Sequence, residues 1–312
     1  MVRLVFDIGG TKTRAGLFDV RSSTLTQTLS APTPNHLDQP RATFEELRVA
    51  LLSLMNRLGD ELTRPDEVAD VGVAFAGPID PAGLVLAAPT VWGTRLQSPI
   101  SLSEDLGRHW PRARVRVLND VTAAGFRHLR TDDEDFCIVT VSSGIGNKIF
   151  SRGRPLLGKS GRGGELGHLR VDESPEAPVC ECGGRGHLGA IASGRGVVAW
   201  ARSHAQVRDA ATLTSGDLAA AFRRGERWAV EVVGRCAAPL GWALAAMHLG
   251  LGIERFVLFG GFALALGEPY RALVSSAAGQ RCWSGQGSFT VELGIDDDWS
   301  GLIGAGLAGG RQ

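Results

Sequence analysis

Two histidines and two cysteines in the middle of the chain have the residue types of a metal site. They are His168, Cys180, Cys182 and His187. Thiolate sulfur and imidazole nitrogen are the ligands that Zn²⁺ prefers, and four of them form a tetrahedral structural site. The sequence therefore predicts a zinc ion held by these four side chains. The alternative is that this knot contains no metal and that His187 is an ordinary surface residue.

Glu165 lies three residues before His168, and in a helical turn the two side chains would share a face. A carboxylate accepts hydrogen bonds and an imidazole can donate or accept them. Both functions are needed to bind the hydroxyl groups of a sugar or a sugar-like alcohol. We therefore predict that Glu165 and His168 contact a polyol.

A short apolar run, Val2–Ile8, passes directly into a glycine-containing turn. The turn and its flanks supply five candidate residues for binding phosphate: Asp7, Gly9, Gly10, Thr11 and Lys12. Glycines let backbone N–H groups approach a phosphate closely, and Asp7 would hold Mg²⁺ through water. The spacing excludes a Walker A loop. The alternative is an ordinary hairpin turn.

Two further glycine-containing segments follow apolar strand-like runs. The earlier segment predicts another phosphate-binding loop. The later segment predicts a surface for the nucleotide base or ribose. Each is a weak signal alone. Their candidate residues are Ser143, Gly144 and Gly146, and then Gly260 and Gly261.

The dipeptide Asn119-Asp120 stands between a predicted strand and a predicted helix. An Asp in this place can take a proton from an attacking hydroxyl as a general base. The same residue types are also typical of a helix N-cap, which is the alternative interpretation.

The bulk composition excludes several classes of protein. The 312 residues contain 33 basic and 33 acidic side chains, so no general attraction to nucleic acid or to an anionic membrane is expected. The chain opens without a secretory leader and has no run of 18 apolar residues, which predicts a cytoplasmic protein. Five cysteines with one closely spaced pair indicate reduced thiols and one metal cluster.

Strand-like and helix-like segments alternate along the chain, which predicts an α/β protein. We expect an N-terminal domain over 1–118, onto which a C-terminal helix at about 298–312 packs back. A second domain over 119–297 would carry the zinc knot at 168–187. The expected strands are Val2–Ile8, Thr13–Phe18, Thr24–Ala31, Val71–Phe75, Leu84–Ala87, Arg114–Leu118, Cys137–Ser142, Lys148–Ser151, Arg255–Phe259 and Thr290–Leu293. The expected helices are Thr43–Gly59 with a Thr43/Glu46 capping box, Val121–Leu129, Gly196–His204, Thr214–Phe222, Glu226–Leu249 and Ser300–Ala308.

These motifs together resemble the ROK family of repressors and sugar kinases. The resemblance rests on Asp-Ile-Gly-Gly-Thr-Lys at residue 7, Asn-Asp at 119, Gly-Glu-X-Gly-His at 164 and Cys-X-Cys-Gly-X-X-Gly at 180. It implies a two-domain actin-like, hexokinase-like (ribonuclease H-like) fold with a central cleft. It also implies ATP, Mg²⁺ and structural Zn²⁺ as cofactors, and a homodimer.

The resemblance assigns a role to each candidate residue. Asp120 is the catalytic base, and the polyol is contacted by Gly77, Thr90, Asn119, Glu165 and His168. The residues at 7–12, the Ser143 loop and the pair Gly260-Gly261 match the ATP side. His168 would bind zinc through one ring nitrogen and face the sugar with the other.

Two positions depart from the family pattern on the acceptor side. Gly189 stands where the family has a Glu that contacts the anomeric hydroxyl, and Thr90 stands where it has Asn. His187 replaces the third zinc cysteine. A cyclitol has no anomeric hydroxyl and would not need that Glu. The pattern thus resembles C7-cyclitol kinases, while drift in a glucokinase is the alternative.

We therefore predict an ATP-dependent kinase that phosphorylates a primary hydroxyl of a hexose or a hexose-like cyclitol. An N-acetylhexosamine kinase and a non-catalytic sugar sensor are the alternatives. A repressor of the family would carry a helix-turn-helix domain before the Asp-Ile-Gly-Gly motif. Here that motif begins at residue 7, so we do not expect a repressor.

Overall fold

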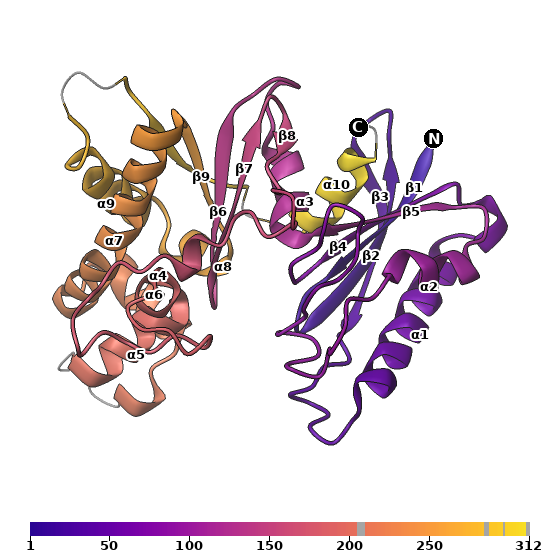
Figure 1. The fold of residues 1–312 in the computed structure, drawn as a ribbon, viewed down its shortest axis with the longest axis horizontal. Helices are drawn as coiled ribbons and strands as arrows, with labels where there is room; N and C mark the ends of the chain where they lie inside the picture. The colour runs from indigo at the N-terminus through magenta and orange to yellow at the C-terminus, as the bar shows by residue number, and fades with distance from the viewer. Residues whose placement is uncertain (205–209, 284–286, 296, 310–312) are drawn as a thin grey trace. The chain divides into compact units, whose positions relative to one another are not determined.

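The computed structural model describes residues 1–204, 210–283, 287–295 and 297–309, which divide into two compact units. Unit 1 comprises Met1–Leu129, Leu157–Gly163 and Asp297–Gln312. Unit 2 comprises Arg130–Leu156 and Gly164–Asp296. Each unit is built around one five-stranded sheet with helices against it (Figure 1), as the α/β prediction expects.

The sheet of unit 1 has the strand order β3-β2-β1-β4-β5. The first three strands form an antiparallel meander, and β4 and β5 run parallel to β1. The strands are β1 (Val2–Ile8), β2 (Lys12–Asp19), β3 (Thr24–Pro32), β4 (Asp70–Phe75) and β5 (Arg114–Asn119). The parallel pairing brings the carboxyl ends of β1, β4 and β5 to one edge, where Asp7, Gly77 and Asn119 lie in or just after the strands.

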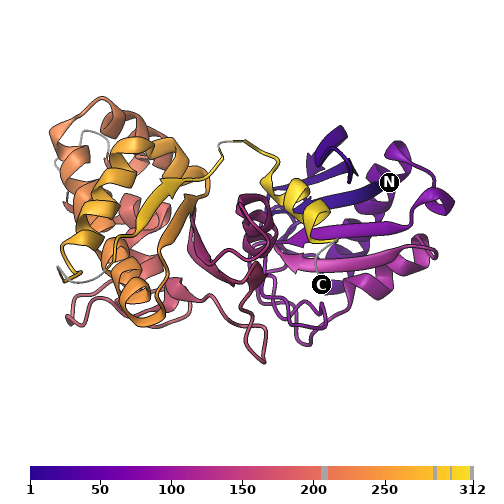
Figure 2. The same ribbon diagram turned by 90° about the horizontal axis from the view of Figure 1, so that it is seen from above.

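Helices cover both faces of this sheet because β1 is apolar on both faces. Leu4, Phe6 and Ile8 pack with α1 (Phe44–Leu62) and α2 (Leu102–His109) in one core cluster. Val5 instead packs with α3 (Asp120–His128) and α10 (Ser300–Ala308) in a second cluster. Both ribbon views show α10 against the strands of unit 1 (Figure 2). A short 3₁₀ turn, Pro65–Glu67, precedes β4.

Most of the expected elements are present, and the Thr43/Glu46 capping box at the start of α1 is confirmed. The segment Leu84–Ala87 is different, since it forms only isolated bridges, from Val85 to Ile79 and to Ile100. Val85 is nevertheless fully buried in the core of unit 1. Its apolar pattern therefore reflects packing of an irregular segment and not a strand in the sheet.

The first unit extends past the boundary that the sequence suggested at residue 118. Helix α3 stays with unit 1 because it packs tightly against α10, which lies about 180 residues later in the chain. At the crossing, a Cβ added to Gly304 would lie 1.7 Å from the carbonyl oxygen of Ala123. The two backbones are therefore in direct contact.

This contact predicts a loss of stability in the Gly304→Ala variant. The added methyl group must push the two helices apart, and overpacking of this kind costs about 1–3 kcal/mol. We expect a lower urea midpoint of unfolding, followed by circular dichroism. Gly107→Ala on α2 is the matched control, because a Cβ there meets nothing within 4 Å. An unchanged midpoint for Gly304→Ala would contradict the close packing of α3 on α10.

The sheet of unit 2 has the strand order β10-β9-β6-β7-β8. Its strands are β6 (Phe136–Val141), β7 (Ile145–Ser151), β8 (Arg154–Pro155), β9 (Arg255–Phe259) and β10 (Thr290–Leu293). Its helices are α4 (Leu188–Ala192), α5 (Gly194–His204), α6 (Ser215–Arg223), α7 (Arg227–Leu251), α8 (Gly261–Leu266) and α9 (Glu268–Gly279). Two 3₁₀ turns, η2 (Leu166–His168) and η3 (Ala210–Thr212), complete it.

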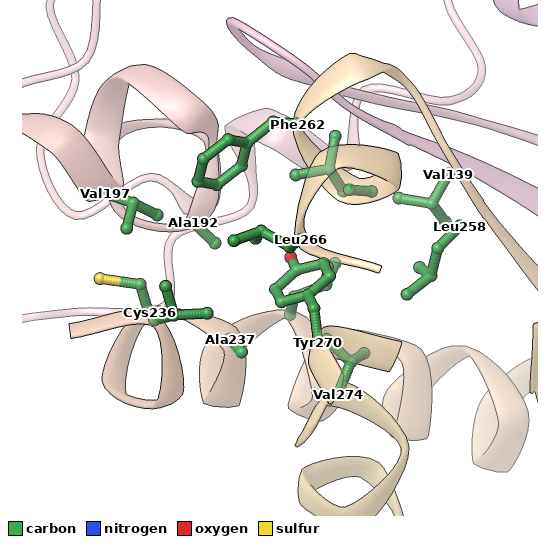
Figure 3. Packing of buried hydrophobic residues seen from close by; sticks show 14 of the residues in the cluster. Val139, Ala192, Val197, Cys236, Ala237, Leu258, Phe262, Leu266, Tyr270 and Val274 are labelled. Atoms are coloured by element: carbon green, nitrogen blue, oxygen red, sulfur yellow. The ribbon is translucent and has the colours of Figure 1, made fainter. Parts of the chain in front are cut away.

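The core of unit 2 joins these helices to the sheet. Figure 3 shows Tyr270 and Val274 of α9 beside Ala237 of α7 and Leu266 of α8, with Leu258 of β9 nearby. Among the described residues, α7 is the helix long and apolar enough to span a membrane. However, 56% of its most apolar window is buried within the protein, as in a core helix.

Candidate active site

The turn between β1 and β2 is a tight hairpin whose tip is formed by Gly10 and Thr11. The Gly9 N–H donates to the Lys12 carbonyl at 3.0 Å, and the Thr33 hydroxyl donates to the Gly9 carbonyl at 2.8 Å. A Cβ at Gly10 would lie 2.8 Å from the carbonyl oxygen of Thr90. Any larger residue at position 10 would therefore clash with Thr90, which is itself exposed to solvent.

Asp7 faces Arg14 across this hairpin, since the two are register partners in the β1–β2 ladder. The Arg14 guanidinium donates to Asp7 Oδ2 at 3.3 Å and also pairs with Asp298 at 3.2 Å. Burial raises the pKa of Asp7 to about 7, with Arg14 opposing the rise and the nearby negative charge of Asp120 adding to it. Gly301 of α10 lies against the same carboxylate. Asp7 is therefore a confined acidic group next to Asp120.

Asp120 is the first residue of α3, and its carboxylate is held by two donors. The Val121 N–H and the Asn119 side-chain amide each donate to Asp120 Oδ1 at 2.9 Å. Asn119 is the N-cap of α3, because its Oδ1 accepts from the amides of Val121 and Thr122. The Asn119 amide also donates to the Gly77 carbonyl at 2.9 Å. Cap and carboxylate thus form one network that fixes Asp120.

In unit 2, the candidate phosphate loop is shorter than the sequence suggested. The turn is confined to Ser142–Gly144, where the Ser142 N–H donates to the Gly144 carbonyl at 2.9 Å. Gly146 lies inside strand β7 and pairs with Thr140, so it is a strand residue. The difference arises because β6 and β7 pair as far as Val141 and Ile145.

Gly260 and Gly261 lie at the start of α8. Gly260 has a φ of 95°, a conformation that favours glycine, and a Cβ there would lie 2.6 Å from the Thr140 hydroxyl. Gly261 borders a pocket of about 730 Å³ together with Ser142 and Ser143. This volume lies within the range of about 300–1,000 Å³ that is typical of small-molecule pockets.

Glu165 immediately precedes the η2 turn and His168 ends it, with the Glu165 carboxylate 3.9 Å from His168 Nε2. The turn is anchored by Asn147, whose side-chain oxygen accepts from the Leu166 N–H at 3.1 Å. A second pocket of about 300 Å³ is bordered by His168 and Gly189. A Cβ at Gly189 would lie 3.1 Å from the Gly167 carbonyl oxygen.

The four predicted metal ligands converge in unit 2, with their ligand atoms within 4.8 Å of one another. His187 Nδ1 lies 3.2 Å from Cys182 Sγ, and His168 Nδ1 lies 3.9 Å from Cys180 Sγ. Ligands of a tetrahedral zinc ion are about 3–4 Å apart, given metal–ligand distances of about 2.0–2.3 Å. The donor set and its spacing therefore fit Zn²⁺. His168 turns Nδ1 to this cluster and Nε2 to Glu165.

The structure thus brings the sequence-predicted residues together in two sets. Unit 1 gathers the hairpin tip, Asp7, Gly77, Thr90 and the Asn119-Asp120 pair, and unit 2 gathers the others. Sequence reasoning missed three polar residues at these sites. They are Arg14, Asn147 and Arg195, of which Arg195 borders the two pockets just described. The hairpin register alone points to Arg14, because residue 14 must pair with residue 7 when the turn spans 9–12.

Comparison with known proteins identifies the family. The model of the ROK family matches residues 3–307. A C(7)-cyclitol 7-kinase of Streptomyces hygroscopicus subsp. jinggangensis is 37% identical, covering 99% of this chain and 94% of its own length. An N-acetylmannosamine kinase of Escherichia coli O9:H4 is 31% identical, covering 88% of this chain and 87% of its own.

A solved structure supports the same conclusion. The ROK hexokinase of Thermus thermophilus aligns with a TM-score of 0.77 and 29% identity, covering 98% of this chain and 97% of its own. The match confirms the hexokinase-like fold. The chain therefore belongs to the ROK family.

Proposed function

We propose that this protein is an ATP- and Mg²⁺-dependent kinase that phosphorylates the primary hydroxyl of a hexose-like polyol, with a C7-cyclitol as its preferred acceptor. The observation that carries the kinase assignment is the held carboxylate of Asp120, next to Asp7 at one edge of the unit 1 sheet. The similarity to a C(7)-cyclitol 7-kinase over 99% of this chain supports the acceptor class. A sensor without catalytic activity would have no need for this arrangement.

Asp120 takes the proton of the acceptor hydroxyl as that oxygen attacks the γ-phosphorus and the bond to ADP breaks. Its carboxylate oxygen Oδ1 already accepts two hydrogen bonds, which fix the orientation of the group. Asn119 therefore acts chiefly by positioning Asp120. Glu165 and His168 bind hydroxyl groups of the acceptor, and Gly77 and Thr90 border it.

The phosphate groups are bound by backbone amides at the Gly10-Thr11 tip and the Ser143-Gly144 turn, together with Lys12. Mg²⁺, when bound, neutralises phosphate charge, and Asp7 would hold it through water. The pocket bordered by Gly261 takes the nucleotide, with Gly260 allowing close approach of its adenosine part.

We also propose that His168, Cys180, Cys182 and His187 bind a structural Zn²⁺. The ion would hold His168 Nδ1, so that Nε2 of the same ring faces the acceptor together with Glu165. One ring thereby joins the metal site to the acceptor site. We further expect the protein to be cytoplasmic and to form a homodimer, and light scattering would test the dimer.

The acceptor preference follows from Gly189, which leaves its pocket without the family's carboxylate. A site that lacks the partner of a particular hydroxyl discriminates less strongly for it. Restoring that group in Gly189→Glu should raise the ratio of kcat/KM for glucose to that for the cyclitol about tenfold. Gly234→Glu is the control, since a Cβ on that α7 residue meets nothing within 4 Å. An unchanged ratio would remove Gly189 as a determinant of specificity.

ADP release with ATP and Mg²⁺ tests the proposed function directly. The acceptors to compare are valienol as the C7-cyclitol, glucose, N-acetylmannosamine and N-acetylglucosamine. We expect the highest kcat/KM on the cyclitol. A preference for N-acetylmannosamine would instead support the alternative of an N-acetylhexosamine kinase, as in the 31% identical E. coli relative. ADP release that depends on none of these acceptors would contradict the kinase assignment.

A further inference from the structure

Arg195 borders both of the pockets described above in unit 2. It is the second residue of α5 and lines the larger pocket with Ser143 and the smaller pocket with His168 and Glu181. A guanidinium group has five N–H donors in a planar fork, so it can bind two partners at once. Arg195 is therefore placed to join the two sites.

On one side, Arg195 holds the Ser142–Gly144 turn. Its Nε donates to the Ser143 carbonyl at 2.7 Å, and the neighbouring Gly194 N–H donates to the Ser142 carbonyl at 2.8 Å. In a trans peptide the N–H points opposite to the C=O. Fixing these two carbonyls toward α5 therefore directs the amides of Ser143 and Gly144 away from α5, side by side. Successive amides with a common direction form an anion-binding site.

On the other side, Arg195 forms a two-pronged ion pair with Glu181. Nη2 donates to Glu181 Oε2 at 3.0 Å, and Nη1 donates to Oε1. Glu181 is the middle residue of the Cys180-Glu181-Cys182 motif, so its position depends on how the two thiols are held. The same guanidinium thus contacts the phosphate turn and the metal-binding loop.

We propose that Arg195 is a positioning residue that couples the Cys/His cluster to the second phosphate turn, so that metal binding raises nucleotide affinity. The inference rests on the proposed function, which places the nucleotide phosphates at that turn. A metal ion on the cluster fixes Glu181, Glu181 fixes the guanidinium, and the guanidinium fixes the peptide that presents the Gly144 amide. By linkage, nucleotide must then also retain the metal.

The ion pair itself contributes little to folding. The side chains of Arg195 and Glu181 are 57% and 74% exposed, and exposed pairs contribute about 0–1 kcal/mol. Substitutions should therefore leave the protein folded. The exposed pair Arg224–Glu226, at 2.7 Å in the same unit, supplies a matched control, because neither residue borders the two pockets.

The test is calorimetric titration of the full-length protein with AMP-PNP and Mg²⁺, with and without zinc. We expect the nucleotide Kd to rise about tenfold in Arg195→Met and about threefold in Glu181→Gln, and the double variant to match Arg195→Met. Removing zinc should weaken nucleotide binding in the unsubstituted protein but not further in Arg195→Met. AMP-PNP should slow zinc loss to a chromogenic chelator, except in Arg195→Met. Arg224→Met should behave like the unsubstituted protein.

Three outcomes would overturn the inference. The first is an unchanged affinity of Arg195→Met for AMP-PNP. The second is an unchanged nucleotide Kd in Glu181→Gln. The third is an equal weakening of nucleotide binding by zinc removal in Arg195→Met and in the unsubstituted protein. Each of these, with normal binding by the unsubstituted protein, refutes the coupling and leaves the proposed kinase function standing. Failure of the unsubstituted, zinc-loaded protein to bind AMP-PNP would refute both.

Discussion

Asp120→Asn should lower kcat about 1000-fold while leaving acceptor binding detectable. General-base catalysis contributes about 10²–10⁴ in rate, and an amide cannot take up the proton of the attacking hydroxyl. The substitution keeps an oxygen that can accept from the Val121 N–H and from Asn119, so the fold of the α3 start is preserved. Steady-state ADP release gives kcat, and calorimetric titration with the acceptor gives its affinity.

Asp66→Asn controls for the loss of a carboxylate in unit 1. Asp66 is an exposed residue of the 3₁₀ turn Pro65–Glu67, outside both sets of site residues. We expect its kcat to equal that of the unsubstituted protein. Near-normal turnover by Asp120→Asn would show that another group takes the proton, and the role assigned to Asp120 would be wrong.

Cys182→Ala should abolish zinc binding and lower kcat/KM for the acceptor about 100-fold. The variant removes one of four ligands, and Cys182 Sγ lies 3.2 Å from His187 Nδ1, so the remaining cluster loses its shape. Metal affinity falls about 10–100-fold even when the group removed only hydrogen-bonds to a metal ligand. His168 would then lose the contact that orients its ring toward the acceptor. Elemental analysis gives the zinc content and ADP release gives kcat/KM.

Cys282→Ala is the matched control, because Cys282 is a partly buried thiol of the same unit outside the cluster. It should keep the zinc and the activity of the unsubstituted protein. Zinc retained by Cys182→Ala at full stoichiometry would show that these four residues are not the metal site. Zinc lost with kcat/KM unchanged would instead separate the metal from the acceptor site.

The motifs that lie on short, regular segments could be predicted from the sequence. The Asp7 hairpin follows from two apolar runs around a double glycine, and the Cys/His cluster follows from ligand chemistry at close spacing. The strand ending at Asn119 and the helix beginning at Asp120 are likewise local features. In each case the residues that interact are near neighbours in the chain, so local patterns contain the information.

Features made by distant segments could not be predicted in the same way. The domain boundary at residue 118 missed α3, because the contact of Ala123 with Gly304 joins residues about 180 apart. The segment Leu84–Ala87 has the apolar pattern of a strand, yet Val85 is buried by packing in the unit 1 core and not by a place in the sheet. Arg195 contacts Ser143 and Glu181, which come from two other segments, and nothing in its own neighbourhood signals either contact.

The most direct test of the central claim is to identify the product. The protein would be incubated with ATP, Mg²⁺ and valienol, and the product examined by two-dimensional ¹H–³¹P NMR. We expect one new phosphorus signal coupled to the methylene protons of the primary alcohol, with one ADP formed per product. Phosphorus coupled to a ring methine proton, or ADP and free phosphate without a phosphorylated acceptor, would contradict it.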